Sequence, residues 1–443
     1  MKPVSASDLA RYADAHKAKP DAKLLHNALY KLGINDLAFV GDNMVGKNFN
    51  FSIDIKTLPA TNQKSSGRCW LFAATNILRE KIAKEKNLEN FELSQAWLAF
   101  WDKFERCNYY LESILSLIDR DIDDRTLTFV ISGGVSDGGQ WDMFVNIIEK
   151  YGILPKDNYP DNAQSCGTGQ MNTQLNINLK RCAAKLRALY AAGASAEELA
   201  AAKDEMLKKI YIFLVTCYGE PPKTFDFEFK DKDGKITVEY GWTPLEFKKK
   251  YVGDMLKDYV SIINGPTADK PFHKLYTVEL LGNVADGEIV KYLNLPMDEF
   301  KAAVLAQMKD GEIVWFGSDC GKFGERQSKA LWDPAIYDYP SVTGLENDLT
   351  KAEALDYHYS AMNHAMVLTG VHLVDDKPTR WKIENSWGTD GPNKGYHFCT
   401  DEWFDRFVYQ AVVHKKYLEA YKDVLESEPT VLKPWDPMGT LAE

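Results

Sequence analysis

The sequence predicts an α+β fold with two lobes and a cleft between them, because its texture changes from helical to strand-rich along the chain. Before residue 273, apolar residues recur mainly every three to four positions, as on one face of a helix. After it, runs such as GEIVWFGSD (311–319) and HAMVLTGVHLV (364–374) are rich in β-branched and aromatic residues, as strands are. Hydrophobic residues make up 45% of the 443 residues, so a large core can form.

Helices are expected in five stretches of the first half. The segment 69–86, CWLFAATNILREKIAKEK, is the clearest, because Leu71, Ala74 and Leu78 share one face. Gly67 cannot extend this helix backward well, so Cys69 is expected in its first turn. The next helices are expected at 5–33, with Ser5 or Ser7 as the cap, at 94–117, and at 142–151, before Gly152. A pair of helices is expected within 172–218, with a break near AAGAS. Residues 133–141 are expected to form a loop.

Composition and charge disfavour some classes of partner. The chain carries 53 basic and 64 acidic residues, a net charge of −11, which repels nucleic acid and anionic membranes. No apolar run approaches the ~18 residues of a membrane span, and the N-terminus lacks the apolar core of a secretory signal. Seven scattered cysteines without a CxxC pair suit a reducing compartment. We therefore expect a cytoplasmic protein without a membrane or nucleic-acid partner. We also expect no cofactor and no metal; the HExxH motif of zinc peptidases does not occur.

Cys69 is the leading candidate for a nucleophile. Most free cysteines are small buried apolar residues, but three local features single this one out. It opens a helix, whose positive end stabilises a thiolate, and Arg68 precedes it. Gln63 lies upstream in a polar loop that can fold back over the helix start, where its amide can donate to an oxyanion beside the N–H of Cys69.

A thiol needs a base, and His364 is the candidate among the eight histidines, because it begins a strand-like run and can project from the strand end. The midpoint between His364 and Asn385 falls at 374.5, at the front edge of the turn VDDKPT (374–379). An antiparallel hairpin therefore brings the two nearly opposite each other, allowing for a bulge. The amide oxygen of Asn385 can then fix the imidazole tautomer. Trp387 lies two residues after Asn385, so in an extended chain its side chain points to the same side and can cover their hydrogen bond.

These motifs resemble the papain superfamily of cysteine peptidases. The matching segments are QKSSGRCWLFAATNILR (63–79), GGQWDMFVNIIEKYGILPKDNYP (138–160), NHAMVLTG (363–370) and ENSWG (384–388). The likeness is greatest to the bleomycin hydrolase or aminopeptidase C branch, because of the helical insertion expected after residue 165 and the C-terminal WDPMGTLAE. The resemblance covers nearly the whole chain and implies a papain-like two-lobed fold, with a helical lobe, a β-barrel-like lobe, a helical insertion and a C-terminal arm in the cleft.

The resemblance also implies the site residues and the reaction. Carried over by position, the nucleophile is Cys69, and the general base and acid is His364. Asn385 is the residue that orients the base, and Gln63 is the oxyanion donor. The implied reaction removes N-terminal residues from peptides through an acyl-thioester, in a homohexameric ring with active sites facing an inner cavity. The chain departs from secreted papains at Ser66, which replaces the first Cys of their signature.

The change from helical to strand-like sequence patterns, together with the resemblance, divides the chain into five segments. They are an N-terminal helical arm (1–62), a helical lobe with the candidate Cys (63–165), a mainly helical insertion expected to serve oligomerisation (166–272), a β-rich lobe with the candidate His and Asn (273–415), and a C-terminal arm (416–443).

The C-terminal segment 435–443 decides which type of peptidase is expected. It carries several apolar side chains but only two side-chain charges, so it is expected to pack into a groove. If the groove is its own cleft, the final carboxylate of Glu443 would pair with the amino group of the substrate and make the enzyme an aminopeptidase. An arm that covers a neighbouring subunit is the alternative. Two other functions stay open, namely a cysteine endopeptidase with an open cleft and a hollow oligomer that binds nucleic acid or peptide.

Overall fold

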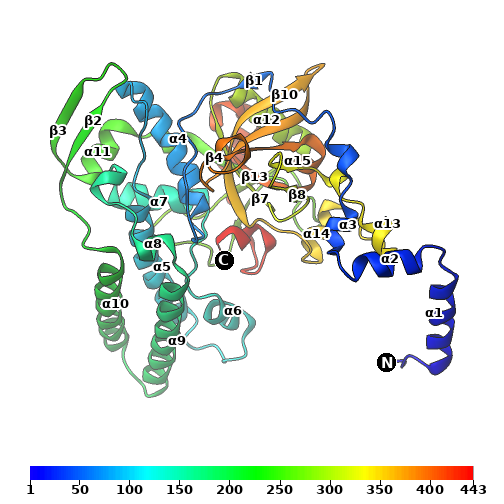
Figure 1. Ribbon diagram of the computed structural model, residues 1–443. Coiled ribbons are helices and arrows are strands. Elements are labelled where there is room, and N and C mark those ends of the chain that lie inside the picture. The colour runs from blue at the N-terminus through cyan, green and yellow to red at the C-terminus, as the bar shows by residue number, and fades with distance from the viewer. Residues whose placement is uncertain (443) are drawn as a thin grey trace. The chain divides into compact units, whose positions relative to one another are not determined.

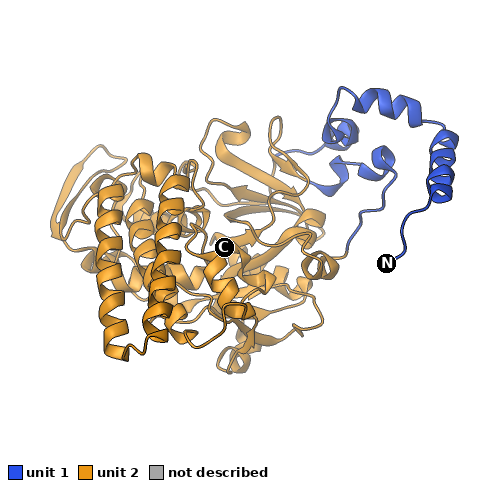
Figure 2. Ribbon diagram, turned by 90° about the horizontal axis from the view of Figure 1, so that it is seen from below, with its two compact units in different colours: residues 1–49, 333–349 blue, residues 50–332, 350–443 orange. Residues whose placement is uncertain are grey.

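The computed structural model describes residues 1–442, which form two compact units (Figure 2). The smaller unit combines residues 1–49 with 333–349, and the larger combines 50–332 with the residues from 350 onward. All the candidate site residues that the structure describes belong to the larger unit. Glu443, whose carboxylate is expected to pair with the amino group of the substrate, lies outside the described residues.

The larger unit begins with helices and continues with strands (Figure 1). The first group of helices is α4 (Cys69–Lys86), α5 (Gln95–Ser116), α6 (Arg125–Gly133), α7 (Trp141–Tyr151), α8 (Ala163–Cys166), α9 (Gly169–Ala191), α10 (Ala196–Tyr218) and α11 (Pro244–Tyr251). The helices among the later strands are α12 (Met297–Lys309), α14 (Lys351–Asp356), α15 (Asp401–Phe407) and α16 (Lys422–Leu425). None of the described helices is long and apolar enough to cross a membrane.

One mixed sheet organises the second half of the chain. Its order is β14–β5–β6–β4–β13–β7–β10–β11–β12–β9–β8, and β1 pairs with β10. The bounds are β1 (Ile53–Asp54), β4 (Tyr259–Ile263), β5 (Lys274–Val278), β6 (Tyr292–Asn294), β7 (Val314–Ser318), β8 (Gly324–Glu325), β9 (Leu331–Trp332), β10 (His364–Val374), β11 (Lys377–Glu384), β12 (Tyr396–Thr400), β13 (Val408–His414) and β14 (Thr430–Leu432). The predicted α+β class is confirmed by this arrangement.

The predicted helices of the larger unit are present, and the hairpin that follows them was not foreseen. Helix α4 covers 69–86, as predicted, and Ser94 caps α5 through a hydrogen bond from the backbone of Trp97. A separate two-stranded sheet, β2 (Phe225–Lys230) with β3 (Ile236–Trp242), lies in the segment expected to be mainly helical. The alternation in FDFEFK was its signal, because Phe225 and Phe227 are buried while Asp226 and Glu228, which each follow one of them, are exposed.

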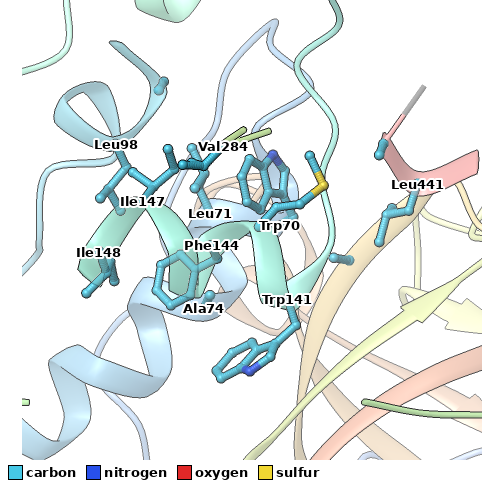
Figure 3. Close-up of a cluster of buried hydrophobic side chains, with 14 of the residues drawn as sticks. Trp70, Leu71, Ala74, Leu98, Trp141, Phe144, Ile147, Ile148, Val284 and Leu441 are labelled. Atoms are coloured by element: carbon cyan, nitrogen blue, oxygen red, sulfur yellow. The ribbon is translucent and has the colours of Figure 1, made fainter. Parts of the chain in front are cut away.

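Both faces of strand β10 are buried, which explains its continuous apolar sequence. Ala365 and Val367 belong to one apolar cluster, and Met366 and Leu368 belong to another. Successive side chains of a strand point to opposite faces, so β10 is covered on both sides. The first cluster extends into the helical lobe, where side chains of α4 and α7 pack against each other (Figure 3). Burial on both faces fixes the strand that begins at His364.

The smaller unit contains short helices with little core. They are α1 (Ala6–Ala18), α2 (Ala22–Leu29), α3 (Ile34–Ala38) and α13 (Tyr339–Thr343). The helix expected over 5–33 is interrupted at Pro20, because proline lacks a backbone N–H and disfavours helical geometry in the residue before it. Ser5 caps α1 as expected, and neither α1 nor α2 contains a buried residue.

The five predicted segments stay a proposal about organisation, and the compact units follow a different division. Residues 333–349, within the predicted β-rich segment 273–415, group with the N-terminal residues. Strand β4, which ends the stretch predicted as an insertion, pairs with β13 in the large sheet. Chain segments far apart in sequence therefore contribute to the same unit.

Candidate active site

Cys69 is the first residue of α4 and is almost completely buried. Its Sγ accepts a hydrogen bond from the backbone N–H of Ala365, at 3.4 Å. Ala365 follows His364 at the start of β10, so this contact joins the helix start to the strand start. The two predicted reactive side chains are therefore presented by neighbouring segments of the two lobes.

The residues before Cys69 allow a close approach of two loops. An added Cβ at Gly67 would lie 2.8 Å from the Cβ of Asp137, so a larger residue would displace the second loop. The backbone N–H of Gly67 also donates to Asp137, at 3.1 Å. Arg68 was expected to favour a thiolate, but its guanidinium is buried and pairs with Asp161 at 2.8 Å. That pairing neutralises its charge locally, so the expected support from Arg68 is not seen.

Asn385 fixes the tautomer of His364. The Oδ1 atom of Asn385 accepts from the backbone N–H of Ser386 at 2.8 Å, which identifies it as the oxygen end of the amide. The same Oδ1 lies 2.9 Å from Nε2 of His364, so Nε2 must carry the proton and donate. A neutral imidazole then keeps its lone pair on Nδ1. The expected hydrogen bond between these two side chains is present, and it prepares Nδ1 as a proton acceptor.

The β10–β11 hairpin brings His364 and Asn385 together as expected, although the register differs in detail. Both residues at its tip, Asp375 and Asp376, have positive φ, which is the geometry of a two-residue hairpin turn. The register shifts twice along the hairpin and places Val367 opposite Glu384. Asn385 therefore lies just beyond the end of β11 and reaches His364 with its side chain.

Trp387 covers the imidazole. Its ring centre lies 5.1 Å from that of His364, and the planes are inclined by 26°, so the two rings stack. His397 contacts the edge of Trp387 and stacks on Trp332, which extends the aromatic packing away from the site. This packing shields the bond between His364 and Asn385 from water.

Gln63 is held by two serines, and one of its amide N–H groups has no hydrogen-bond partner among residues 1–442. Its Oε1 accepts from the hydroxyl of Ser386 at 2.6 Å, and its Nε2 donates to the carbonyl of Ser66 at 2.5 Å. A side-chain amide has two N–H donors, so the second is available to a ligand. Ser386 thus contacts both Gln63, through its hydroxyl, and Asn385, through its backbone N–H.

Burial disfavours an isolated charge on either reactive group. Burial raises the pKa of the Cys69 thiol to about 11, although the backbone N–H groups of Ala365 and Trp70 act in the opposite direction. Burial also lowers the pKa of His364 to about 4, opposed by the hydrogen bond to Asn385. Burial thus acts against the charged form of each side chain, while the backbone N–H groups at Cys69 and the Asn385 oxygen at His364 act in favour of it.

A buried ion pair holds α4 against the end of β11. Arg79, three turns into α4, lies 2.8 Å from Oε1 of Glu384, and the Nδ2 group of Asn76 donates to the same oxygen at 2.7 Å. Burial raises the pKa of Glu384 to about 7, opposed by the charge of Arg79. Because Glu384 directly precedes Asn385, this network holds Asn385 in position relative to the helix of Cys69.

The C-terminal segment is anchored by a buried ion pair. The Nζ of Lys270 lies 2.8 Å from Oδ2 of Asp436, and both side chains are buried. The other oxygen of Asp436 accepts from the backbone N–H of Met438. The carbonyl of Met438 accepts from Gln140 and from Tyr292, each at 3.3 Å. The short helix Pro437–Ala442 therefore starts from a fixed point.

The end of this segment lies against the loop that follows α6. The carbonyl of Ala442 accepts from Ser136 at 2.8 Å and from Arg106 at 3.2 Å. An added Cβ at Gly138 would lie 2.1 Å from the carbonyl oxygen of Leu441, so only glycine permits this approach. The described part of the tail thus packs on its own chain.

The tail is linked to Cys69 through one layer of packing. Gly139 lies so close to Trp70, the residue after Cys69, that an added Cβ would be 2.5 Å from its indole. The indole N–H of Trp70 donates to the carbonyl of Asp137 at 2.7 Å. The loop 136–139 therefore has the C-terminal segment on one side and the start of α4 on the other.

Known proteins match this chain over nearly its whole length. The Peptidase C1-like family matches residues 3–439. The chain belongs to the Peptidase C1-like family. Aminopeptidase C of Lactobacillus delbrueckii subsp. lactis is 46% identical over 446 residues, covering 100% of this chain and 99% of the relative. Human bleomycin hydrolase is 42% identical, covering 89% of each chain.

A solved structure of this family superposes closely on the chain. The crystal structure of PepW from Lactobacillus rhamnosis has a TM-score of 0.96 and 47% identity, with 99% of each chain covered. The predicted membership of the bleomycin hydrolase and aminopeptidase C branch is confirmed, and so is the papain-like fold. The predicted class of enzyme, a cysteine-type aminopeptidase, is confirmed by the same matches.

Sequence reasoning missed three groups at this Peptidase C1-like site. They are the hydroxyl of Ser386, the backbone N–H of Ala365 and the carboxylate of Asp161. Ser386 stands between two residues that were singled out, so its place in ENSWG was a usable signal. A backbone N–H carries no sequence signal, and the partner of Arg68 lies 93 positions away in the chain.

Proposed function

We propose that this cysteine aminopeptidase uses Cys69 as nucleophile and His364 as general base and acid. Asn385 orients the base, and Gln63 donates to the oxyanion. The observation that carries the proposal is the tautomer of His364, because protonated Nε2 on Asn385 leaves Nδ1 as the one ring atom that can take a proton.

The proposed reaction begins with proton transfer from Cys69 to His364. Nδ1 of His364 accepts the thiol proton as Sγ of Cys69 attacks the carbonyl carbon, and the carbonyl oxygen becomes an oxyanion. The free N–H of Gln63 and the backbone N–H of Cys69 donate to that oxyanion, since the first N–H groups of a helix have no partner within it. The imidazolium then protonates the leaving amine as the C–N bond breaks. Water, deprotonated by His364, hydrolyses the acyl-thioester and restores the thiol.

The C-terminal segment makes this chemistry act at N-termini. It lies against Gly138, and there it is proposed to block a chain that extends beyond the first residue of a substrate. The final carboxylate of Glu443 is proposed to pair with the free ammonium group of that residue. The anchoring of Ala442 by Ser136 and Arg106 supports this role, since it fixes the residue from which Glu443 extends.

Digestion of a mixture of peptides tests the proposed function. Mass spectrometry should show stepwise loss of single residues from free N-termini, while peptides with acetylated N-termini remain intact. Internal cuts at a comparable rate would instead favour the endopeptidase with an open cleft.

Gln63→Ala is expected to lower kcat by about 10²- to 10³-fold, the usual effect of removing one oxyanion donor. The KM for an aminoacyl-coumarylamide should change little, because the oxyanion forms only after binding. Ser386→Ala is the matched comparison, since it leaves the amide in place and removes only the hydroxyl that orients it. Ser386→Ala should therefore lower kcat less than Gln63→Ala does. A larger loss of kcat in Ser386→Ala would contradict the role assigned to Gln63.

We further propose a cytoplasmic homohexamer that takes peptides and does not bind nucleic acid. Exposed apolar side chains on α1 and after α2, including Leu9 and Leu32, support an assembly in which these helices are covered by other copies. The net charge of −11 supports the absence of a nucleic-acid partner. A hollow oligomer that retains nucleic acid is the less favoured alternative for the same reason.

A further inference from the structure

Arg326 carries an exposed guanidinium without an ion-pair partner in the part of the chain that the structure describes. It follows strand β8, and its Nη2 donates to the carbonyl of Cys320 at 3.2 Å. The neighbouring carboxylate of Glu325 is occupied by the turn that follows, where it accepts from the backbone of Ser328 and Lys329. The positive charge of Arg326 is therefore free to meet a ligand.

The guanidinium lies over the ring that covers the catalytic base. Its central carbon is 4.6 Å from the ring centre of Trp387, and that ring stacks on His364 at 5.1 Å. A cation over an indole face is held there by the ring quadrupole. The charge also reaches the imidazole, because it adds to the larger effect of burial in lowering the pKa of His364. One aromatic ring thus separates a free cation from the group that protonates the leaving amine.

The leaving part of the substrate must pass this cation. The C-terminal segment lies against Gly138, next to Gly139, which contacts Trp70; in the proposed function it closes the direction taken by the N-terminal residue of the substrate. The rest of the peptide therefore leaves from the other side, where Gln63 pairs with Ser386 and where Trp387 lies. An extended chain advances ~3.3–3.6 Å per residue, so the first two residues after the scissile bond remain near this ring.

We infer that Arg326 binds a carboxylate on the leaving part of the peptide, within two residues of the scissile bond. This inference rests on the proposed aminopeptidase function and adds a substrate preference to it. Two sources have the same chemistry, namely the C-terminal carboxylate of a short peptide and the side chain of Asp or Glu. A guanidinium suits both, because its planar fork of donors matches a carboxylate.

Two substrate pairs test the inference and separate the sources. One pair is a dipeptide with a free C-terminus and its C-terminal amide. The other is a tripeptide amide with Glu or Gln directly after the scissile bond. The ratio of kcat/KM within a pair isolates the carboxylate, whatever else the variant changes. We expect the wild-type chain to favour the anionic member by about five- to tenfold in at least one pair, as for a partly exposed charge-assisted contact.

Arg326→Gln should bring that ratio to about one, and raising the salt concentration to about 1 M should reduce it in the wild type, because an exposed charge pair is screened. Arg120→Gln is the matched control, since Arg120 is a surface arginine on another part of the larger unit and should keep the wild-type ratio. If Arg326→Gln changes the ratio of kcat/KM in the dipeptide pair alone, the contact is with the C-terminal carboxylate. If it changes the ratio in the tripeptide pair alone, the contact is with the side chain of Glu.

Equal turnover of both members of each pair by the wild type, or a preference that survives in Arg326→Gln, would overturn the inference. Failure of the proposed function would look different, because neither member of a pair would then lose its N-terminal residue.

Discussion

Cys69→Ala is expected to lower kcat by on the order of 10⁶-fold, as when a nucleophile is removed from an enzyme that forms a covalent intermediate. In the proposed mechanism Sγ of Cys69 accepts the acyl group, and alanine has no atom that can form this bond. Cys69 is buried and contacts the N–H of Ala365, so the variant should fold with only a small loss of stability. The measurement is the release of a coumarin from a free aminoacyl-coumarylamide, together with the thermal midpoint.

Cys399→Ala is a suitable control for this experiment. Cys399 is also a fully buried cysteine, but it lies within β12 and not at the start of α4. Its replacement should change stability modestly and leave turnover largely intact. If Cys69→Ala retained peptidase activity while folded, the nucleophile would be assigned wrongly, whatever the family.

Deletion of Thr440–Glu443 is expected to lower aminopeptidase activity by about 10²-fold or more, because the group that positions the substrate N-terminus is lost. Cleavage of N-blocked peptides should appear at the same time if the tail blocks longer chains as proposed, because the contact of Leu441 with Gly138 is removed. Lys270 and Asp436 remain in this variant, so the preceding part of the tail keeps its anchor. Parallel assays of a free and an N-acetylated substrate measure both changes.

Two point changes separate the parts played by the tail. Glu443→Gln keeps the terminal carboxylate and removes only the side-chain charge, so it should preserve the preference for free N-termini. Deletion of Glu443 alone moves the carboxylate back to Ala442 and should weaken that preference without admitting long blocked peptides. A truncated enzyme that still discriminates fully against N-blocked substrates would show that the tail does not select the N-terminus.

Local sequence patterns were sufficient for the elements that present the reactive groups. Four-residue periodicity and a preceding glycine gave α4 with Cys69 at its start. The turn at 374–379 gave the hairpin, and hence the pairing of His364 with Asn385, without any tertiary information. The helical stretch predicted over 5–33 is divided into α1 and α2, because Pro20 interrupts it.

The sequence by itself determined the fold class, the branch of the family and the identity of the candidate residues, because these depend on periodicity, turns and short motifs. Only the tertiary structure decided how the charges around them are used. It paired Arg68 with Asp161, placed Ser386 on Gln63, and left Arg326 free over Trp387. Such contacts join residues far apart in the chain. Burial raises the pKa of Cys69, and the site becomes buried only when the helical lobe, the sheet and the C-terminal segment pack together.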